Sequence, residues 1–585
     1  MSDTAVRPRK PSVHKLPVTG VLRLNSPAEI WYKPALSVVV ASAVPNLLLY
    51  SLDRLDLVMY TMAGSLCALY GHNLPYARRV HTVLRVVLGM AAGFAVALVT
   101  ASFTESTPVL IAVGALLAAV QKTFCDATRI GPPGNVIFTF VTSAALFAPQ
   151  EIGQVPGHMA LMLAAGAFSW LVSTGPVLWR REGPERLATA RALDAAAAYA
   201  TAPDSRTRHA VATAVQAAWQ SLLAAGRPTP VRQELERLVV HAERTLATVA
   251  TDSRVPAVGH VPTVGHVPTV GHVPDVDPDE LRRWAADTRS RGPVPSPPLA
   301  PGTVEQLFGI DAERAGQRMR RGRREARRRL LRALGPGSPV LPVAFRTLLG
   351  CALAGYVSAA LGVGHPYWAI VTAAAVYQPN LALSWSRAVQ RTVGNLLGVL
   401  VFAAVIPLAR VGSLALVLCV LFFSFAAEAL ITRNYWLGSI AVTPMALLIL
   451  EFGGFQPAGR LIGDRALDTL VGVAVGFLVA IAVTNRRASG RVELAIAAAA
   501  DARRRAERAV ADPTADALVL ETARRRLTAC LVELRDASDV ASGEWWQRAL
   551  PEQELLAAEQ AGHRTLAATA QRQGLITLPP TSGAV

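Results

Sequence analysis

Long apolar segments, separated by short polar connections, are the feature that most constrains this 585-residue chain. They form two groups of six, one within residues 34–180 and the other within residues 341–485. A bilayer core offers the backbone no hydrogen-bond partners, so a segment that crosses it must pair its own N–H and C=O groups as a helix. The sequence therefore predicts an all-α, polytopic membrane protein with two six-helix transmembrane blocks, each followed by a helical cytoplasmic domain.

Several of these segments are shorter than the ~20 residues that a full crossing needs. Notable among them are the segments near residues 55–71, 108–121 and 134–149. Transporter folds often place their binding sites at short or interrupted spans. The alternative is that these helices extend a few residues beyond the predicted bounds.

The positive charge predicts the orientation. The net charge is +17 and the sequence pI is about 10.4, and basic residues are concentrated in alternate connections, which the positive-inside rule places in the cytoplasm. Residues 1–33 are polar and basic, and no cleavable signal pattern follows them. We therefore expect a multi-pass protein of the cell inner membrane with both termini in the cytoplasm. No nucleic-acid-binding signature accompanies the charge, so we expect no nucleic acid partner.

A repeat divides the polar region between the two apolar groups. Residues 181–258 have the recurring apolar positions of amphipathic helices. The hexapeptide GHVPTV or GHVPDV then occurs three times between residues 259 and 276. Its histidines, His260, His266 and His272, suit a metal ion, but a proline and a glycine in every repeat favour an extended linker. We therefore expect no metal and no cofactor.

An arginine-rich segment precedes the second apolar group, with ten arginines from Arg314 to Arg332. Such a juxtamembrane basic helix binds anionic lipid headgroups. The predicted organisation is a cytoplasmic N-terminal segment (1–33), a first transmembrane block (34–180), a cytoplasmic helical domain (181–258), a His/Val/Pro/Gly repeat and Pro-rich linker (259–302), the basic juxtamembrane helix (303–340), a second transmembrane block (341–485) and a C-terminal cytoplasmic helical domain (486–585).

Residues 365–401 place charge at the entrance of an apolar helix. Arg387 and Arg391 are four residues apart, so on a helix they share a face and present two guanidinium groups to one anion. Gly394 and Gly398 follow, at the spacing that lets membrane helices pack closely. The corresponding residues of the first group are Arg85, Gly89 and Gly93.

Arginines at the cytoplasmic helix ends are the candidate substrate pathway. If the two groups pack around a common axis, these arginines line a vestibule and attract carboxylates. A guanidinium group holds a carboxylate by two hydrogen bonds, and Tyr367, Trp368 or Tyr377 offers a face to an aromatic ring. The candidate arginines are Arg85, Arg129, Arg387, Arg391 and Arg433.

These residues also have simpler interpretations. Arginine at a helix end commonly extends to the lipid headgroups and fixes topology. Tyr367 and Trp368 fit an aromatic belt at the outer membrane interface.

Acidic residues within apolar segments are candidates for proton coupling. Glu428 is the first candidate, although it also suits an ion pair with Arg433. Asp464, Arg465 and Asp468 suit the same role or, more simply, mutual pairing on a helix surface at the outer end.

One set of residues matches a known pattern: Tyr367-Trp368, Thr372, Gln378-Pro379, Arg387, Arg391 and Gly394 to Gly398. In these residues the chain resembles the fusaric acid resistance protein family, whose superfamily includes bacterial aromatic acid exporters and, more distantly, plant aluminium-activated malate transporters. The resemblance covers residues 340–485 well and 34–180 weakly, and Asn395 stands where the family often has threonine. It implies an exporter of aromatic acids and adds Thr372 to the candidate pathway.

We therefore expect an inner-membrane transporter that exports small, aromatic organic anions. An ion gradient is the expected driving force because no nucleotide-binding motif is evident, and no motif indicates an enzyme. The alternatives are a passive organic-anion channel on the same scaffold and a non-transporting membrane anchor for envelope functions. The glycine pairs also permit packing between chains in a homo-oligomer.

Overall fold

The computed structural model describes most of the chain, and in that part every regular element is a helix. The all-α prediction is therefore confirmed. The described residues are 16, 20–128, 130–225, 229–252, 277–296, 340–483, 488–515, 517–543 and 552–572. Arg129, the His-Val-Pro repeat and the predicted basic helix before Val340 lie outside them.

Eight helices in the described residues are long and apolar enough to cross a membrane, and four apolar helices are shorter. In chain order, the first set is α1 (Tyr32–Ser51), η1 (Leu55–Leu57), α2 (Val58–Ser65), η2 (Leu66–Leu69), α3 (Tyr76–Phe103), α4 (Thr107–Thr128), α5 (Val136–Leu146), η3 (Ile152–Gln154), α6 (Val155–Thr174) and η4 (Gly175–Leu178). The second set is α12 (Val340–Ala360), α13 (Tyr367–Val376), α14 (Leu381–Ala409), α15 (Ser413–Ile431), α16 (Tyr435–Glu451) and α17 (Ala458–Ala482).

These lengths support a multi-pass membrane protein and refine the predicted spans. Helix α4 has 22 residues, so the segment predicted at 108–121 was drawn too short. Residues Leu55–Leu69 and α5 remain shorter than a full crossing, as do α13 and α16. Helix length alone therefore establishes eight candidate crossings rather than twelve.

Both sets of apolar helices have the same order of lengths: long, short, long, long, short, long. The contacts between the sets follow the same symmetry. Helix α1 packs against α15, while α12 packs against α4, so the first helix of each set meets the fourth of the other. The short helix α13 packs against α5, and α16 against α2. These pairings are those of two copies related by an approximate two-fold axis. They support a duplication of the six-helix set within the chain.

The predicted packing glycines lie at helix contacts within the chain. A Cβ atom on Gly394 would lie 2.5 Å from the carbonyl oxygen of Trp436, and one on Gly398 would lie 2.8 Å from that of Ile440. Both glycines therefore let α14 approach the backbone of α16. In the first set, Gly89 and Gly93 of α3 have the same role against side chains of α4 and α5: Phe124, Phe138, Gln121 and Thr142.

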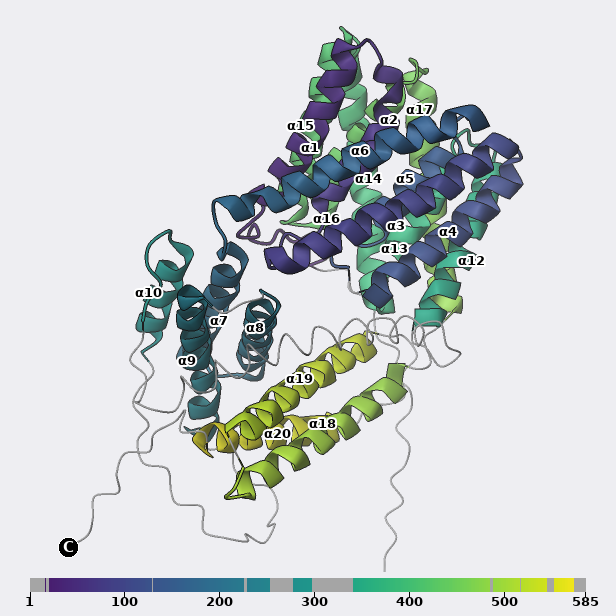
Figure 1. Cartoon of the computed structure of the whole chain (residues 1–585). Helices are drawn as coiled ribbons and strands as arrows, with labels where there is room; N and C mark the ends of the chain where they lie inside the picture. The colour runs from purple at the N-terminus through teal and green to yellow at the C-terminus, as the bar shows by residue number, and fades with distance from the viewer. Residues whose placement is uncertain are drawn as a thin grey trace, which may run out of the picture.

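Two smaller helical bundles lie at one end of the apolar helices (Figure 1). The first bundle consists of α7 (Gly183–Thr201), α8 (Ser205–Ala224), α9 (Pro230–Asp252) and α10 (Pro278–Arg289), which share one apolar core. The second bundle consists of α18 (Ala488–Ala511), α19 (Ala517–Ser542) and α20 (Glu552–Arg572) around a core of its own.

Helix α10 corrects the predicted linker at 259–302. Leu281 and Ala285 are buried in the core of the first bundle, and the Asp277 carboxylate caps the helix by accepting a hydrogen bond from the backbone N–H of Asp279 at 2.8 Å. The stretch 278–289 is therefore part of the bundle. The Pro- and Gly-rich composition on either side concealed a short helix with few apolar positions.

A buried acidic residue joins the two bundles. Glu243 of α9 forms an ion pair with Arg524 of α19 at 3.0 Å and accepts a hydrogen bond from the indole N–H of Trp219 on α8 at 3.2 Å. The guanidinium group of Arg525 lies over the same indole ring, 4.3 Å from its centroid. Because the ion pair is buried, removal of either partner would leave an uncompensated charge. The two bundles therefore pack as one unit.

The contact between α14 and α16 can be tested with one methyl group. We expect Gly394→Ala to destabilise the protein by about 1–3 kcal/mol, because the added Cβ meets backbone that has no room to move. The measurement is the thermal midpoint of the detergent-solubilised protein. Gly463→Ala in α17 is the matched control, because its Cβ would meet nothing within 4 Å. Equal midpoints for the two variants would contradict the assigned close contact.

Candidate functional site

Two arginines of α14 converge on the first residue of α16. The Asn380 side chain caps α14 by accepting a hydrogen bond from the N–H of Leu383 at 2.8 Å. Two turns into the helix, the Arg387 guanidinium lies 3.9 Å from the centroid of the Tyr435 ring. Arg391 donates a hydrogen bond from Nη1 to the Tyr435 hydroxyl at 2.7 Å, and its Nε has no partner among the described residues. The two guanidinium groups therefore share one face, and Arg391 is only 4% exposed.

A further buried arginine, Arg465, lies on α17. Arg465 is 2% exposed, and its Nε and Nη1 atoms have no hydrogen-bond partner among the described residues. Its guanidinium lies over the indole ring of Trp368, 5.2 Å from the centroid. A buried charge without a partner costs several kcal/mol. This arginine is therefore the strongest candidate for holding an anion.

Asp468 lies one helical turn after Arg465 and is also fully buried. One of its carboxylate oxygens accepts a hydrogen bond from the hydroxyl of Ser358 on α12, and the other has no partner among the described residues. The interpretation of Asp464, Arg465 and Asp468 as a pairing on an exposed helix surface is therefore wrong, because the latter two point into the protein.

Three neutral polar side chains on the neighbouring helices bond to one another. The side-chain oxygen of Asn395 accepts a hydrogen bond from the hydroxyl of Thr443 at 3.0 Å, and its amide donates to the hydroxyl of Thr469 at 3.1 Å. These three buried residues come from α14, α16 and α17. Asn395 thus uses both ends of its side chain at the position where the family often has threonine.

The outer end of this arrangement is aromatic. His365 contacts Asp464 at 2.8 Å, and its ring stacks on that of Trp368 with 4.7 Å between centroids. Trp368 is 1% exposed and Tyr367 is 3% exposed, so an aromatic belt facing lipid does not describe them. We call the whole set the polar column. Its members are His365, Asp464, Trp368, Arg465, Asp468, Ser358, Asn395, Thr443, Thr469, Arg391, Tyr435 and Arg387.

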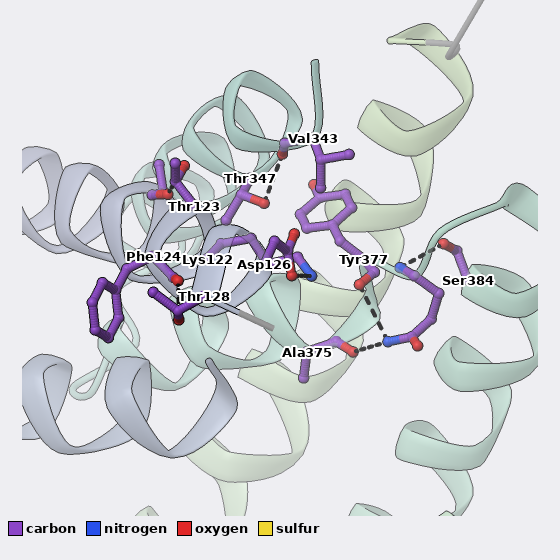
Figure 2. A network of polar contacts seen from close by, with 12 residues as sticks. Lys122, Thr123, Phe124, Asp126, Thr128, Val343, Thr347, Ala375, Tyr377 and Ser384 are labelled. Atoms are coloured by element: carbon purple, nitrogen blue, oxygen red, sulfur yellow. Dashed lines mark hydrogen bonds and ion pairs between the residues drawn. The ribbon is translucent and has the colours of Figure 1, made fainter. Parts of the chain in front are cut away.

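Thr372 lies on α13 and Tyr377 directly follows this helix, and both are beside the polar column. Both are buried, and both hydroxyls lack a hydrogen-bond partner among the described residues. Figure 2 shows the turn after α13, where the amide of Gln378 reaches the carbonyl oxygens of Ala375 and Tyr377. The backbone N–H of Gln378 also donates to the Ser384 hydroxyl at 3.1 Å. This turn therefore holds the ends of α13 and α14 together.

The remaining candidates do not join the polar column. Arg85 and Arg433 are exposed, as expected of residues that fix topology, and Glu428 is half-buried. Within the described residues, Glu428 and Arg433 form no ion pair under 4 Å. Arg129 lies outside the described residues, so its role stays a prediction.

The first set of helices has a buried arginine of a different kind. Arg79 is 3% exposed, but it donates to the backbone carbonyls of Gly71, His72 and Ser173. Its hydrogen-bonding capacity is therefore largely used within the chain. Within the described apolar helices, the buried guanidinium N–H groups that lack a partner belong to Arg391 and Arg465 of the second set.

A small apolar cavity lies where the two sets meet. It has a volume of about 30 Å³ and is lined by α2, α3, α5, α13 and α16, among them Met62, Phe140 and Tyr367. Such a volume holds roughly two water molecules. An organic anion does not fit there in the described conformation.

Segments outside the apolar helices cover the end of the polar column that carries Arg387. The carbonyl oxygen of Val21 accepts hydrogen bonds from the side chains of Gln390 and Asn434, at 2.9 and 3.2 Å. We call residues 20–25 the N-terminal strap. From the other side, the backbone N–H of Ala382 donates to the carbonyl of Gly543, just after α19, at 3.0 Å.

Comparisons with known proteins agree with the predicted resemblance. Residues 351–479 match the family described as fusaric acid resistance protein-like. An uncharacterised membrane protein, YvaC, of Bacillus subtilis (strain 168) is 23% identical over 559 residues, which cover 90% of this chain and 83% of the relative. An uncharacterised protein of Haemophilus influenzae is 34% identical over 133 residues, 22% of this chain and 17% of that protein. No solved structure matches.

The neutral part of the polar column can be tested through stability. We expect Asn395→Leu to lower the free energy of unfolding by about 1–2 kcal/mol, because it removes two interhelical hydrogen bonds. The measurement is a denaturant titration of the solubilised protein. Thr392→Val is the control, since its hydroxyl bonds only to Ala388 of the same helix. Unchanged stability in Asn395→Leu would show that Asn395 does not tie these helices together.

Proposed function

We propose that this chain, whose residues 351–479 form a fusaric acid resistance protein-like module, is a membrane transporter that exports small organic anions, aromatic carboxylates among them. The observation that carries the proposal is the unpaired guanidinium group of Arg465, buried between apolar helices. A site of this kind favours an anion, because a charged partner offsets the cost of desolvating the arginine.

The surroundings of Arg465 suit an aromatic acid. A carboxylate can accept two parallel hydrogen bonds from the free Nε and Nη1 atoms. Trp368 then offers a ring against which an aromatic substrate stacks. Arg391, whose Nε is also free, lies on the neighbouring helix α14 and would serve as the next anion site along the polar column.

We further propose that Arg387 and Arg391 receive the anion from the cytoplasm. In this proposal the protein lies in the inner membrane with both termini in the cytoplasm, an orientation that the basic residues at that end and the attached helical bundles favour. In this arrangement the two sets are six-helix transmembrane blocks, and the short helices are interrupted spans. Residues 303–340 would bind anionic lipid, and the chain would permit a homo-oligomer.

The described conformation is closed in this proposal. The central cavity of about 30 Å³ is too small for an organic acid, and the N-terminal strap covers the cytoplasmic end. Transport would therefore require α13 and α16 to move relative to α2 and α5. An ion gradient would drive the cycle, with Glu428 or Asp468 as the carboxylate that exchanges a proton.

The proposal is tested by efflux of benzoate and phthalate from proteoliposomes that contain the purified protein. We expect Arg465→Gln to reduce efflux at least tenfold, because charge-assisted hydrogen bonds of about 1.5–3 kcal/mol are lost. Arg391→Gln should reduce efflux several-fold. Arg460→Gln is the matched control, since this arginine lies on the same helix but is exposed.

Other outcomes distinguish the alternatives. Efflux that follows the membrane potential and moves no protons would identify a passive anion channel. Efflux equal to that of protein-free liposomes for the wild type would favour the membrane anchor. Wild-type efflux in Arg465→Gln would exclude the buried guanidinium as the anion site.

A further inference from the structure

A second cavity lies far from the membrane helices, between the two cytoplasmic bundles. It has a volume of about 80 Å³ and is lined by α8 of the first bundle and by α19 and α20 of the second. Leu531 and Leu556 form part of its apolar floor. At roughly 10–15 Å³ for each water-sized sphere, the cavity accommodates five or more such spheres. It is therefore large enough for a compact anionic group, such as a phosphate or the carboxylate end of a larger acid.

The polar lining is predominantly basic. Arg208 and His209 come from α8, Arg535 from α19, and Glu559 and His563 from α20. Arg208 donates a hydrogen bond from Nε to the Tyr199 hydroxyl at 3.0 Å, and in the described residues it has no acidic partner within 4 Å.

The acidic groups around this cavity neutralise its charge only in part. The single carboxylate of the lining, Glu559, lies 3.7 Å from Arg535. Arg535 also contacts Asp539 of its own helix at 3.4 Å. The two carboxylates thus lie beside Arg535, and the charge of Arg208 has no counter-ion within 4 Å among the described residues. The cavity therefore has a positive potential on the side of Arg208.

The behaviour of His563 agrees with this potential. Burial, followed by the nearby charges of Arg208 and His209, lowers the pKa of His563 to about 4. The imidazole is therefore uncharged at neutral pH and can accept or donate one hydrogen bond at each ring nitrogen. A bound anion would offset the smaller, repulsive contribution of Arg208 and His209 to this lowered pKa.

We propose that this cavity is a regulatory binding site for a small anion, held by Arg208, His563 and Arg535 at the junction of the two bundles. The chemistry it recognises is a compact group of anionic oxygens, either the carboxylate of a transported acid or a phosphate. Anion binding at this site does not depend on the proposed transport function. Only the proposal that the bound anion regulates transport rests on that function.

Helix α19 connects this site to the polar column. Arg535 lines the cavity, and eight residues later Gly543 accepts the hydrogen bond from the N–H of Ala382 at the start of α14. Eight helical residues span about 12 Å. Asn380, which caps α14, also donates to the carbonyl of Asp539 at 3.4 Å. A ligand that shifts α19 would therefore act on the helix that carries Arg387 and Arg391.

The test measures binding of inorganic phosphate and of benzoate to the full-length protein in nanodiscs by isothermal titration calorimetry. We expect Arg208→Gln to weaken binding at least tenfold. Gln560→Glu, which adds a carboxylate at an exposed position of the cavity lining, should weaken it similarly without disturbing the core. Arg206→Gln is the matched control, because Arg206 is exposed on the same helix and does not line the cavity.

Each outcome bears on the proposal. Binding of benzoate would identify the transported class as the ligand, and binding of phosphate alone would identify a phosphorylated effector. No binding of either to the wild type, or equal weakening in Arg206→Gln, would overturn the site. Hydrogen exchange of residues 378–384 should slow when the anion is added, and unchanged exchange in the presence of bound anion would overturn the link through α19.

Discussion

The packing of the second set of apolar helices depends on one constraint, the buried positive charge of Arg465. The Nε and Nη1 atoms of this arginine have no hydrogen-bond partner among the described residues. Holding such a group in place costs several kcal/mol, which close packing around it must offset. The glycine contacts provide that packing, because Gly394 and Gly398 bring α14 against α16, and Gly472 brings α17 to within contact of α13. The interhelical hydrogen bonds of Asn395 add to it. The same packing that stabilises the bundle thus keeps the guanidinium N–H groups available.

Much of the fold follows from the sequence, because apolar length and positive charge determine which segments become membrane helices. All twelve apolar helices, and the shared face of Arg387 and Arg391, follow from these patterns. The burial of Arg465 and Trp368 does not, since both lie near a predicted helix end where a lipid interface is the simplest environment. Only the tertiary contact of α13 with α17 distinguishes burial inside the protein from a position at the lipid interface. Helix α10 was concealed for a related reason: its few apolar residues become a core only when α7 is beside them.

The two sets of helices show how a duplicated architecture diverges in chemistry. Both have the same order of lengths and exchange equivalent contacts. In the first set the buried Arg79 is satisfied by backbone carbonyls, so it stabilises a turn. In the second set, Arg391 and Arg465 retain N–H groups that have no partner among the described residues. The buried arginine of the first set thus has a structural role, while the second set carries the N–H groups that remain available to a ligand.

The N-terminal strap has a consequence for biosynthesis. Val21 is made early, yet its partners Gln390 and Asn434 follow 369 and 413 residues later in the chain. At about 5–20 residues per second, the ribosome needs roughly 20–80 s to reach them. During that interval Glu29 can already meet Arg191 of α7, whereas the strap itself has nothing to close upon. Closure of the strap therefore requires that the chain as far as α16 has been synthesised and inserted, so the amino-terminal segment reaches its final position only late in biosynthesis.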